Sequence, residues 1–393
     1  MELWNDAEHF PFPISGVTMA YHACENRRLL SAPHLPKTGG STMQLSPCRS
    51  LLLCSLLATA TTVATEPERK VTGDIPAAIR RAIPRLEQGA AGSAKKRQCF
   101  TCHNQAMPAL ALAMAQRKGF VTDRDLFTGQ VQHTVAHLRR GQERYLEGRG
   151  QGGQVITAGY ALWTLQAGGY SPDRLTTAVT GYLLQYQKEA SHWSHPGNRP
   201  PSTGSDFTTT YVALRGLSDF GTDAQQQSIT DRRKLVLQWL TTTPPKDTED
   251  RVFTLRMLHL LGTGQVDIKR CITKLLEQQR PDGGWSQTEQ LDSDAYATGS
   301  VLAAMLETES LKPDHKAVQN GITYLIKQQR ADGSWHTTSR AEPFQTYYES
   351  GFPHGKDQFI SIAASSWATL ALLLTLPDAP ESVQPSAPSS TPD

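Results

Sequence analysis

Two stretches of the chain, ITKLLEQQRPDGGW at 272–285 and ITYLIKQQRADGSW at 322–335, decide the fold. Each reads as the apolar end of a helix, followed by two glutamines, a polar turn with Asp-Gly and a tryptophan. A glutamine at a helix end can bond the orphan carbonyls there. Asp-Gly favours a turn, and the tryptophan packs back over it while its N–H finds an acceptor. A third stretch, GYLLQYQKEASHW at 181–193, follows the same plan.

The spacing of the repeat tryptophans predicts an architecture. Trp285 and Trp335 are 50 residues apart, whereas Trp193 and Trp285 are 92 apart, which leaves room for a degenerate copy at 234–247. A repeat of this length is typical of helix pairs stacked in an array.

Helices of a second type lie between the repeats. They are rich in small and apolar residues nearly all round, as interior helices are. We expect them at 109–119, 155–169, 205–221, 250–264, 294–307 and 358–374. The stretches 123–147 and 314–327 are amphipathic, as outer helices are. The pattern predicts an all-α fold, a closed α/α toroid of six inner and five or six outer helices around a cavity.

The N-terminal part of the chain predicts export. Residues 43–64 combine Met43, Arg49, an apolar run and small residues, which is the pattern of a secretory signal peptide. The run is too short to span a bilayer, and we expect no transmembrane segment elsewhere. The predicted domains are an upstream extension without structure at 1–42, the signal peptide at 43–64, a linker with a cysteine segment at 65–106, the toroid at 107–376 and a disordered Pro/Ser-rich tail at 377–393.

Charge and cysteine content exclude two classes of protein. The formal net charge is +2, which offers no basic surface for nucleic acid. If the signal peptide is removed, the remaining cysteines are Cys99, Cys102 and Cys271, too few for a disulfide framework.

Cys99, Cys102 and His103 have the spacing C-x-x-C-H. In an exported chain this spacing predicts haem c, in which both thiols add to the haem vinyl groups and the histidine coordinates iron. The distal iron ligand is Met114, His133, His137 or none. The haem would make the chain a redox protein with a redox partner.

A zinc ion is an alternative occupant of the cysteine segment. Its ligands would be Cys99, Cys102, His133 and His137, because the two histidines share one helix face at i and i+4. A disulfide or two unliganded thiols are the remaining alternatives.

The segments QQRPDGGW and KQQRADGSW resemble the QW repeats of the squalene-hopene cyclase and prenyltransferase superfamily. The resemblance implies an α/α toroid that binds an apolar, isoprenoid-like ligand, with terpenoid cyclase-type isomerase activity as one outcome. The chain also resembles a group of exported planctomycete-type proteins that combine a CxxCH segment with such repeats. That similarity extends through 192–217 and 347–372.

The segment DSDAYA at 292–297 resembles the D-x-D-D-T-A acid motif of the hopene-type cyclases. Asp294 matches the carboxyl that protonates an alkene in that family, and Asp292 and Tyr296 would tune it. Two departures are that Ala295 replaces an aspartate and Tyr296 a threonine. The alternative is that Asp292 or Asp294 caps the inner helix. Tyr296 also replaces the cysteine that the zinc site of protein prenyltransferases needs, which excludes that activity.

Other polar and aromatic residues are expected near the cavity. Asp206 opens another inner helix, and the loop 349–359 is expected to cover one end with His354, Lys356 and Asp357. Residues expected to line the cavity, unless they are plain core, are Trp163, Tyr211, His259, Tyr296 and Trp367. The sequence therefore predicts a toroid that binds an apolar small molecule. A non-catalytic scaffold and a haem redox protein are the alternatives.

Overall fold

The computed structural model describes residues 75–194, 197, 199–342 and 346–379, and these residues form helices and loops without a named strand. The α-helices are α1 (Ile75–Lys96), α2 (Met107–Arg117), α3 (Arg124–Arg140), α4 (Gln142–Leu146), α5 (Gln154–Ala167), α6 (Arg174–Gln185), α7 (Asp206–Phe220), α8 (Gln226–Thr242), α9 (Thr248–Leu261), α10 (Gln265–Glu277), α11 (Ala295–Glu307), α12 (Lys316–Gln328) and α13 (Gln358–Leu374). Short turns of other helix types are η2 (Cys102–Ala106), η3 (Asp223–Gln225) and η4 (Gly355–Asp357).

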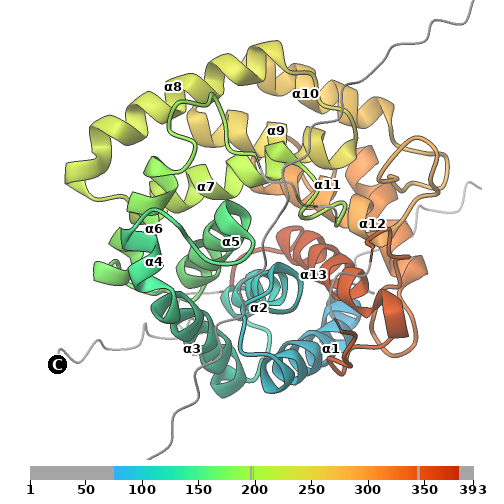
Figure 1. Ribbon diagram of the computed structural model, residues 1–393. Coiled ribbons are helices and arrows are strands. Elements are labelled where there is room, and N and C mark those ends of the chain that lie inside the picture. The colour runs from blue at the N-terminus through green and yellow to red at the C-terminus, as the bar shows by residue number, and fades with distance from the viewer. Residues whose placement is uncertain (1–74, 195–196, 198, 343–345, 380–393) are drawn as a thin grey trace, which may run out of the picture. The chain divides into compact units, whose positions relative to one another are not determined.

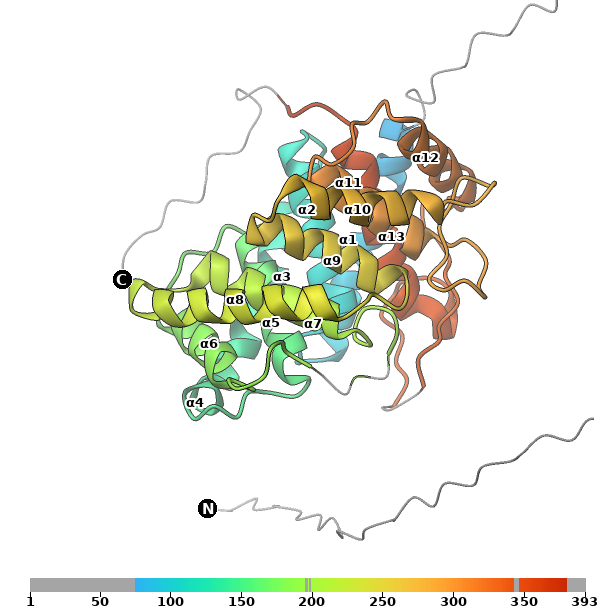
Figure 2. The same ribbon diagram turned by 90° about the horizontal axis from the view of Figure 1, so that it is seen from above.

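The helices of this part of the chain form two concentric rings (Figure 1). The inner ring consists of α2, α5, α7, α9, α11 and α13, each packed on the next, and α13 closes the ring on α2. The outer ring consists of α1, α3, α6, α8, α10 and α12. Figure 2 shows the rings from the side, with α8 and α10 nearest to the viewer. The predicted α/α toroid is confirmed, with the outer ring at six helices over the described residues.

Each repeat tryptophan joins its own outer helix to the next inner helix. The indole N–H of Trp335 donates to the carbonyl oxygen of Leu325 in α12 at 2.7 Å, and its backbone N–H donates to Ser365 Oγ in α13 at 2.9 Å. Trp193 and Trp285 make the same two kinds of bond. All three indoles have no exposed surface, so their N–H groups need these acceptors.

The repeat glutamines join each turn to the following outer helix. Gln279 Nε2 donates to the carbonyl oxygen of Ala317 in α12 at 2.8 Å. Gln329 Nε2 donates to the carbonyl oxygen of Ala78 in α1, also at 2.8 Å. The last repeat thus closes the ring on the first helix by the same contact that links successive repeats.

Glycine is required in these turns for two reasons. Gly283 and Gly333 have φ of 88° and 91°, which disfavours other residues. A Cβ at Gly333 would lie 2.1 Å from the carbonyl oxygen of Arg81 in α1, and one at Gly283 would lie 2.6 Å from that of Asn320 in α12. The Asp-Gly turns therefore fit close against the neighbouring outer helix.

The toroid begins earlier and ends later than the sequence predicts. Part of the linker expected at 65–106 is α1, the first outer helix, which buries Ile79, Ala82 and Leu86 against the ring. At the other end, Asp378 pairs with Lys118 Nζ at 2.8 Å, so the first residues of the expected tail at 377–393 contact the residue that follows α2. The expected extension at 1–42 and the signal peptide at 43–64 lie outside the described residues.

Two expected helical features differ in detail. The stretch 123–147 is broken at Gly141, which ends α3 and precedes α4. A Cβ there would lie 2.1 Å from the side chain of Gln151, so the position favours glycine. The expected degenerate copy at 234–247 contains no such turn around its tryptophan, since Trp239 lies inside α8, where its ring stacks on His192 at 4.4 Å. The first repeat is instead held by Arg232 of α8, whose guanidinium lies 3.8 Å over the Trp193 ring.

Among the described residues, one stretch, Gly355–Leu374, is long and apolar enough to cross a membrane, and it contains α13. The toroid buries 83% of that stretch. Packing inside the ring accounts for its apolar composition.

Candidate ligand-binding site

The inner ring encloses a cavity of about 240 Å³ at one end of the toroid. Every inner helix contributes to its wall, mostly from its C-terminal half, so the inner helices run in the same direction. The lining residues are Leu110, Ala113, Met114, Arg117, Trp163, Gln166, Ala167, Tyr211, Arg215, Arg256, His259, Leu260, Glu307, Thr308 and Leu370. We call this space the axial cavity.

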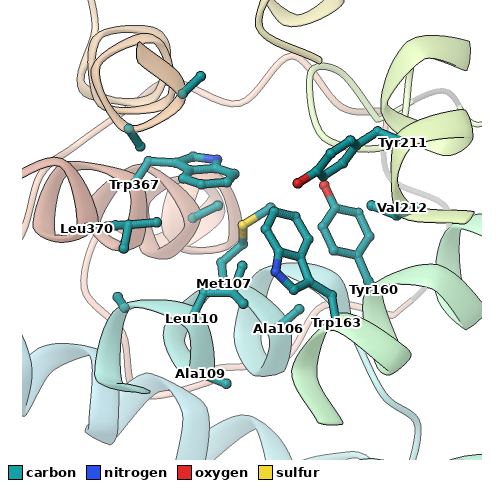
Figure 3. Packing of buried hydrophobic residues seen from close by; sticks show 14 of the residues in the cluster. Ala106, Met107, Ala109, Leu110, Tyr160, Trp163, Tyr211, Val212, Trp367 and Leu370 are labelled. Carbon is teal, nitrogen blue, oxygen red and sulfur yellow. The ribbon is translucent and has the colours of Figure 1, made fainter. Parts of the chain in front are cut away.

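An aromatic layer of Tyr160, Trp163, Tyr211 and Trp367 lies inside the ring, beside the axial cavity (Figure 3). Trp163 and Tyr211 line the cavity, and their ring centroids are 5.5 Å apart. Tyr160 stacks on Trp163 at 6.1 Å, and Trp367 packs against it at 6.3 Å, both behind the wall. Of the residues expected to line the cavity, Trp163, Tyr211 and His259 do so, whereas Tyr296 and Trp367 do not.

Arg256 is a buried cation in the cavity wall. It is only 3% exposed, and its Nη1 pairs with Glu307. Its guanidinium lies 4.9 Å from the Trp367 ring and 5.8 Å from the Trp163 ring. Burial alone would lower the pKa of Arg256, but Glu307 and Tyr211 raise it above its usual range, so the group is charged.

Arg215 lies beside Arg256 in the wall. Its guanidinium lies 5.0 Å over the Trp163 ring, and Nη1 donates to the hydroxyl oxygen of Tyr211 at 3.2 Å. Asp219 pairs with its Nε at 3.4 Å. The C-terminal ends of the inner helices carry partial negative charge, which also favours cations at this end.

A second buried cluster surrounds Glu249 at the N-terminal ends of the inner helices. Glu249 is 4% exposed, and Oε1 accepts bonds from Thr208 Oγ1 at 3.0 Å and from the Tyr296 hydroxyl at 3.2 Å. Its Oε2 is buried and has no partner among the described residues. Burial, with the charge of Asp247, raises the pKa of Glu249 to about 8. The carboxyl therefore carries a proton at neutral pH.

Asp294 has the bonds of a helix cap. It is the N-cap of α11, where Oδ1 accepts from the backbone N–H of Ala297 at 2.9 Å. Oδ2 accepts from Gln287 Nε2 at 2.8 Å. Burial raises the pKa of Asp294 to about 6. The structure brings Tyr296 to Glu249 instead, and Asp292 is exposed.

The other predicted polar residues lie away from the axial cavity. Asp206 is in the first turn of α7, with Oδ2 3.7 Å from His192 Nε2. In the loop, Asp357 bonds His336 Nε2 at 2.8 Å, and His354 Nε2 bonds Ser334 Oγ at 2.8 Å. Those two contacts hold the loop on the last repeat. Lys356, in the same loop, is exposed and has no hydrogen bond or ion pair in the described part of the chain.

The cysteine segment precedes α2 at the opposite end from the axial cavity. Cys99 is exposed, Cys102 is partly buried, and both thiols are free. The His103 ring packs on Phe359 at 5.2 Å, and burial, aided by the charge of Arg199, lowers the pKa of His103 to about 3. The imidazole is therefore neutral.

The residues predicted to coordinate iron or zinc together with the cysteine segment differ in where they lie: His133 contacts the segment, whereas Met114 does not. His133 Nε2 is 3.3 Å from the carbonyl oxygen of Cys99, and burial, with the charge of Arg140, lowers the pKa of His137 to about 4. Met114 lines the axial cavity, at the far end of α2 from His103. In the described ranges no group of three or more His, Cys, Asp or Glu side chains is arranged to hold a metal ion.

Sequence reasoning missed Glu249, Arg215, Arg256 and Glu307. The two arginines could have been recognised from the sequence, because Arg215 and Arg256 interrupt otherwise apolar inner helices. A charged residue in a helix that is apolar nearly all round must face a partner or a cavity. Glu249 lies in the polar run TED at 248–250, which by itself reads as a helix start.

A larger hollow of about 480 Å³ lies beside α9, α10 and the second repeat turn. Its wall is polar and contains no aromatic ring, and its lining residues include Lys246, Asp247, Arg251, Glu277 and Arg280. Aromatic side chains are common in the walls of ligand pockets, so the axial cavity, whose wall contains Trp163 and Tyr211, is the better candidate site.

Residues 216–384 match the family model of the squalene-hopene cyclase C-terminal domain. The matched part contains the second and third repeats and the inner helices α9, α11 and α13, and this part of the chain is squalene-hopene cyclase-like. A comparison with curated proteins finds no match.

Several solved structures are similar to the toroid. Apo type II terpene cyclase MstE from Scytonema is 14% identical, with TM-score 0.45, over 77% of this chain and 98% of that one. A variant of it in complex with geranylgeranyl dihydroxybenzoate is 12% identical, with TM-score 0.47, over 77% and 97%. A possible member of the GH105 family from Klebsiella pneumoniae is 12% identical, with TM-score 0.49, over 82% and 98%.

Proposed function

We propose that the toroid binds a small molecule with an apolar, isoprenoid-like body in the axial cavity. The observation that carries the proposal is a cavity to which every inner helix contributes and whose inner wall is Trp163 and Tyr211. Flat aromatic faces give such a ligand a large contact area. The squalene-hopene cyclase-like repeats support an isoprenoid, because squalene and hopene are isoprenoid hydrocarbons.

The size of the axial cavity limits the ligand. Its volume of about 240 Å³ lies just below the roughly 300–1,000 Å³ that is common for drug-sized ligands. A short isoprenoid, such as a monoterpenoid, therefore suits the cavity better than a long polyprene.

Calorimetric titration with geraniol tests this function. Ala167 lies in the cavity wall at the end of α5, and Ala167→Phe fills the cavity. We expect this variant to bind geraniol at least about tenfold more weakly than the wild type does. Ala136→Phe, on the exposed face of α3, is the control and should bind as the wild type. Equal binding by both variants contradicts the proposal.

A proton-transfer isomerase of the terpenoid cyclase type is the second candidate function. The observation that favours it is Glu249, a buried carboxylic acid with one unpartnered oxygen close to Tyr296. Glu249 does not line the axial cavity, so the reacting alkene has to pass the Trp163 and Tyr211 side chains to reach it. An acid held neutral by burial can give a proton to an alkene carbon, and nearby rings stabilise the cation. Loss of a proton from a neighbouring carbon then yields an isomer.

Product analysis after incubation with geraniol distinguishes an isomerase from a binding protein. If Glu249 is the acid, Glu249→Gln abolishes turnover while Asp294→Asn retains it. The reverse result assigns the acid to Asp294, with Asp292 and Tyr296 tuning it. No turnover by the wild type leaves a non-catalytic binding toroid.

We also propose that the chain is exported and carries haem c on Cys99, Cys102 and His103. Two free thiols and a neutral imidazole are the donor set that haem c needs. His103 Nδ1 lies 3.7 Å from Cys102 Sγ, which leaves Nε2 as the nitrogen that would coordinate iron. When bound, the haem would supply one-electron chemistry and a redox partner.

The test is expression with the native leader in a host that matures c-type cytochromes. We expect covalent haem that survives denaturation, its loss or alteration in Cys99→Ser, and a changed iron spectrum in His103→Ala. N-terminal sequencing of the mature chain tests export. A colourless protein with stoichiometric zinc would instead assign the site to Cys99, Cys102, His133 and His137.

A further inference from the structure

The guanidinium of Arg256 has two hydrogen-bond donors without a well-placed acceptor. Nη1 pairs with Glu307, whereas Nε and Nη2 are buried and make no hydrogen bond of standard geometry within the described residues, with the Tyr211 side chain close by. Nε and Nη2 lie on the same edge of the guanidinium plane, and their N–H bonds point in nearly the same direction. That edge is the fork with which arginine binds both oxygens of a carboxylate.

The charges around the axial cavity leave an excess cation. Arg117, Arg215 and Arg256 line it, and Lys118 lies beside them. The acids that face these four cations are Glu307, Asp219 and Asp378. A charged group whose buried donors have no acceptors costs free energy. A ligand that supplies acceptors to these donors is therefore strongly favoured.

We infer that the axial cavity selects a carboxylate-bearing ligand, whose carboxylate bonds the Nε and Nη2 edge of Arg256 with Arg215 beside it. This inference rests on the proposed function and adds the polar end of the ligand to it. The apolar body would lie against Trp163, and the head would point to the arginines. The ligand class is therefore a short isoprenoid acid.

The Tyr211 side chain lies close to the guanidinium groups of Arg215 and Arg256. Its ring is in the cavity wall, and its hydroxyl accepts from Arg215 Nη1 at 3.2 Å. The same side chain lies close enough to Arg256 to raise the pKa of that arginine. In the ligand-free state the tyrosine hydroxyl thus lies near both guanidinium groups, and the ligand carboxylate takes its place when Tyr211 turns aside.

The experiment compares three probes that share a ten-carbon skeleton: geranic acid, which carries a carboxylate; geraniol, which carries a hydroxyl; and myrcene, which carries neither. By calorimetry we expect the wild type to bind geranic acid at least about tenfold more tightly than geraniol, as charge-assisted bonds to arginine require. Myrcene should bind most weakly.

A variant of Arg256 alone would leave the partly buried Glu307 without its partner. The double variant Arg256→Met/Glu307→Met removes the pair together, and Arg215→Met tests the neighbouring cation. We expect the double variant to lose the preference for geranic acid over geraniol. Arg174→Met, on the exposed surface of α6, is the matched control and should keep the preference.

The outcomes separate the inference from the function on which it rests. Wild-type protein that binds geraniol as tightly as geranic acid overturns the carboxylate subsite and leaves the function standing. A preference that survives in the double variant also overturns it. Binding of none of the three probes overturns the proposed function, and the subsite with it.

Discussion

Glu249 and Arg256 lie seven residues apart on α9, about two helical turns, and of the two Arg256 lines the axial cavity. Tyr160, in the aromatic layer, is close enough to both for each charge to affect the pKa of its hydroxyl. One inner helix therefore carries a proton-bearing acid in its first turn and a cation in the wall of the axial cavity.

The protonated state of Glu249 makes stability depend on pH. Its pKa rises from 4.5 to about 8 on folding, so between these values the folded chain holds a proton that the unfolded chain releases. The free energy of unfolding should fall as pH rises through this range, by up to roughly 1.4 kcal/mol per pH unit from this group. Above about pH 8 the contribution should level off.

Urea unfolding of the wild type and Glu249→Gln across this range measures that contribution, because the difference between the two cancels other titrating groups. Glu143→Gln, at an exposed position on α4, is the control and should follow the wild type. A difference that stays constant from about pH 5 to about pH 8 would show that Glu249 is ionised in the folded chain.

The hydrogen bonds of Gln329 that close the ring should contribute measurably to the free energy of unfolding. Gln329→Ala removes the bonds to Ala78 and to the last repeat turn, and we expect the free energy of unfolding to fall by about 1–3 kcal/mol, because partly buried carbonyls lose their donor. The neighbouring Gln328→Ala changes an exposed side chain and should cost less than about 0.5 kcal/mol. Equal losses in the two variants would speak against a special role for the repeat glutamine.

If Asp294 acts as a helix cap, its Ala and Asn variants should differ in stability. Asp294→Ala should cost about 1 kcal/mol or more, since α11 loses its cap and Gln287 an acceptor. Asp294→Asn should cost little, because asparagine caps helices as well as aspartate does. Thermal unfolding of both, with Asp292→Ala as the exposed control, measures this. An equal loss in the Asn and Ala variants would mean that the carboxylate, not the cap, matters.

The toroid was predictable because its repeats carry local signals. Helix end, glutamine, Asp-Gly and tryptophan act within about fourteen residues, so the sequence displays them directly. The role of α1 was not predictable in this way, because Ala78 and Arg81 meet the last repeat only through ring closure, some 250 residues along the chain.

The candidate site was predicted less well than the fold. Trp163, Tyr211 and His259 were recognisable as cavity residues because aromatic side chains on inner helices can face only the core or the cavity. The position of Asp294 was predicted, but its bonds are those of the capping alternative. The proximity of Glu249 to Thr208 and Tyr296 depends on how three inner helices meet, which no stretch of sequence displays.

A crystal structure of the protein grown with geraniol tests the central claim, that the axial cavity is the ligand site. The account predicts ordered ligand density against the Trp163 ring, within the wall formed by the C-terminal halves of the inner helices. Density for geraniol only in the polar hollow beside α10, with water alone in the axial cavity, would contradict it.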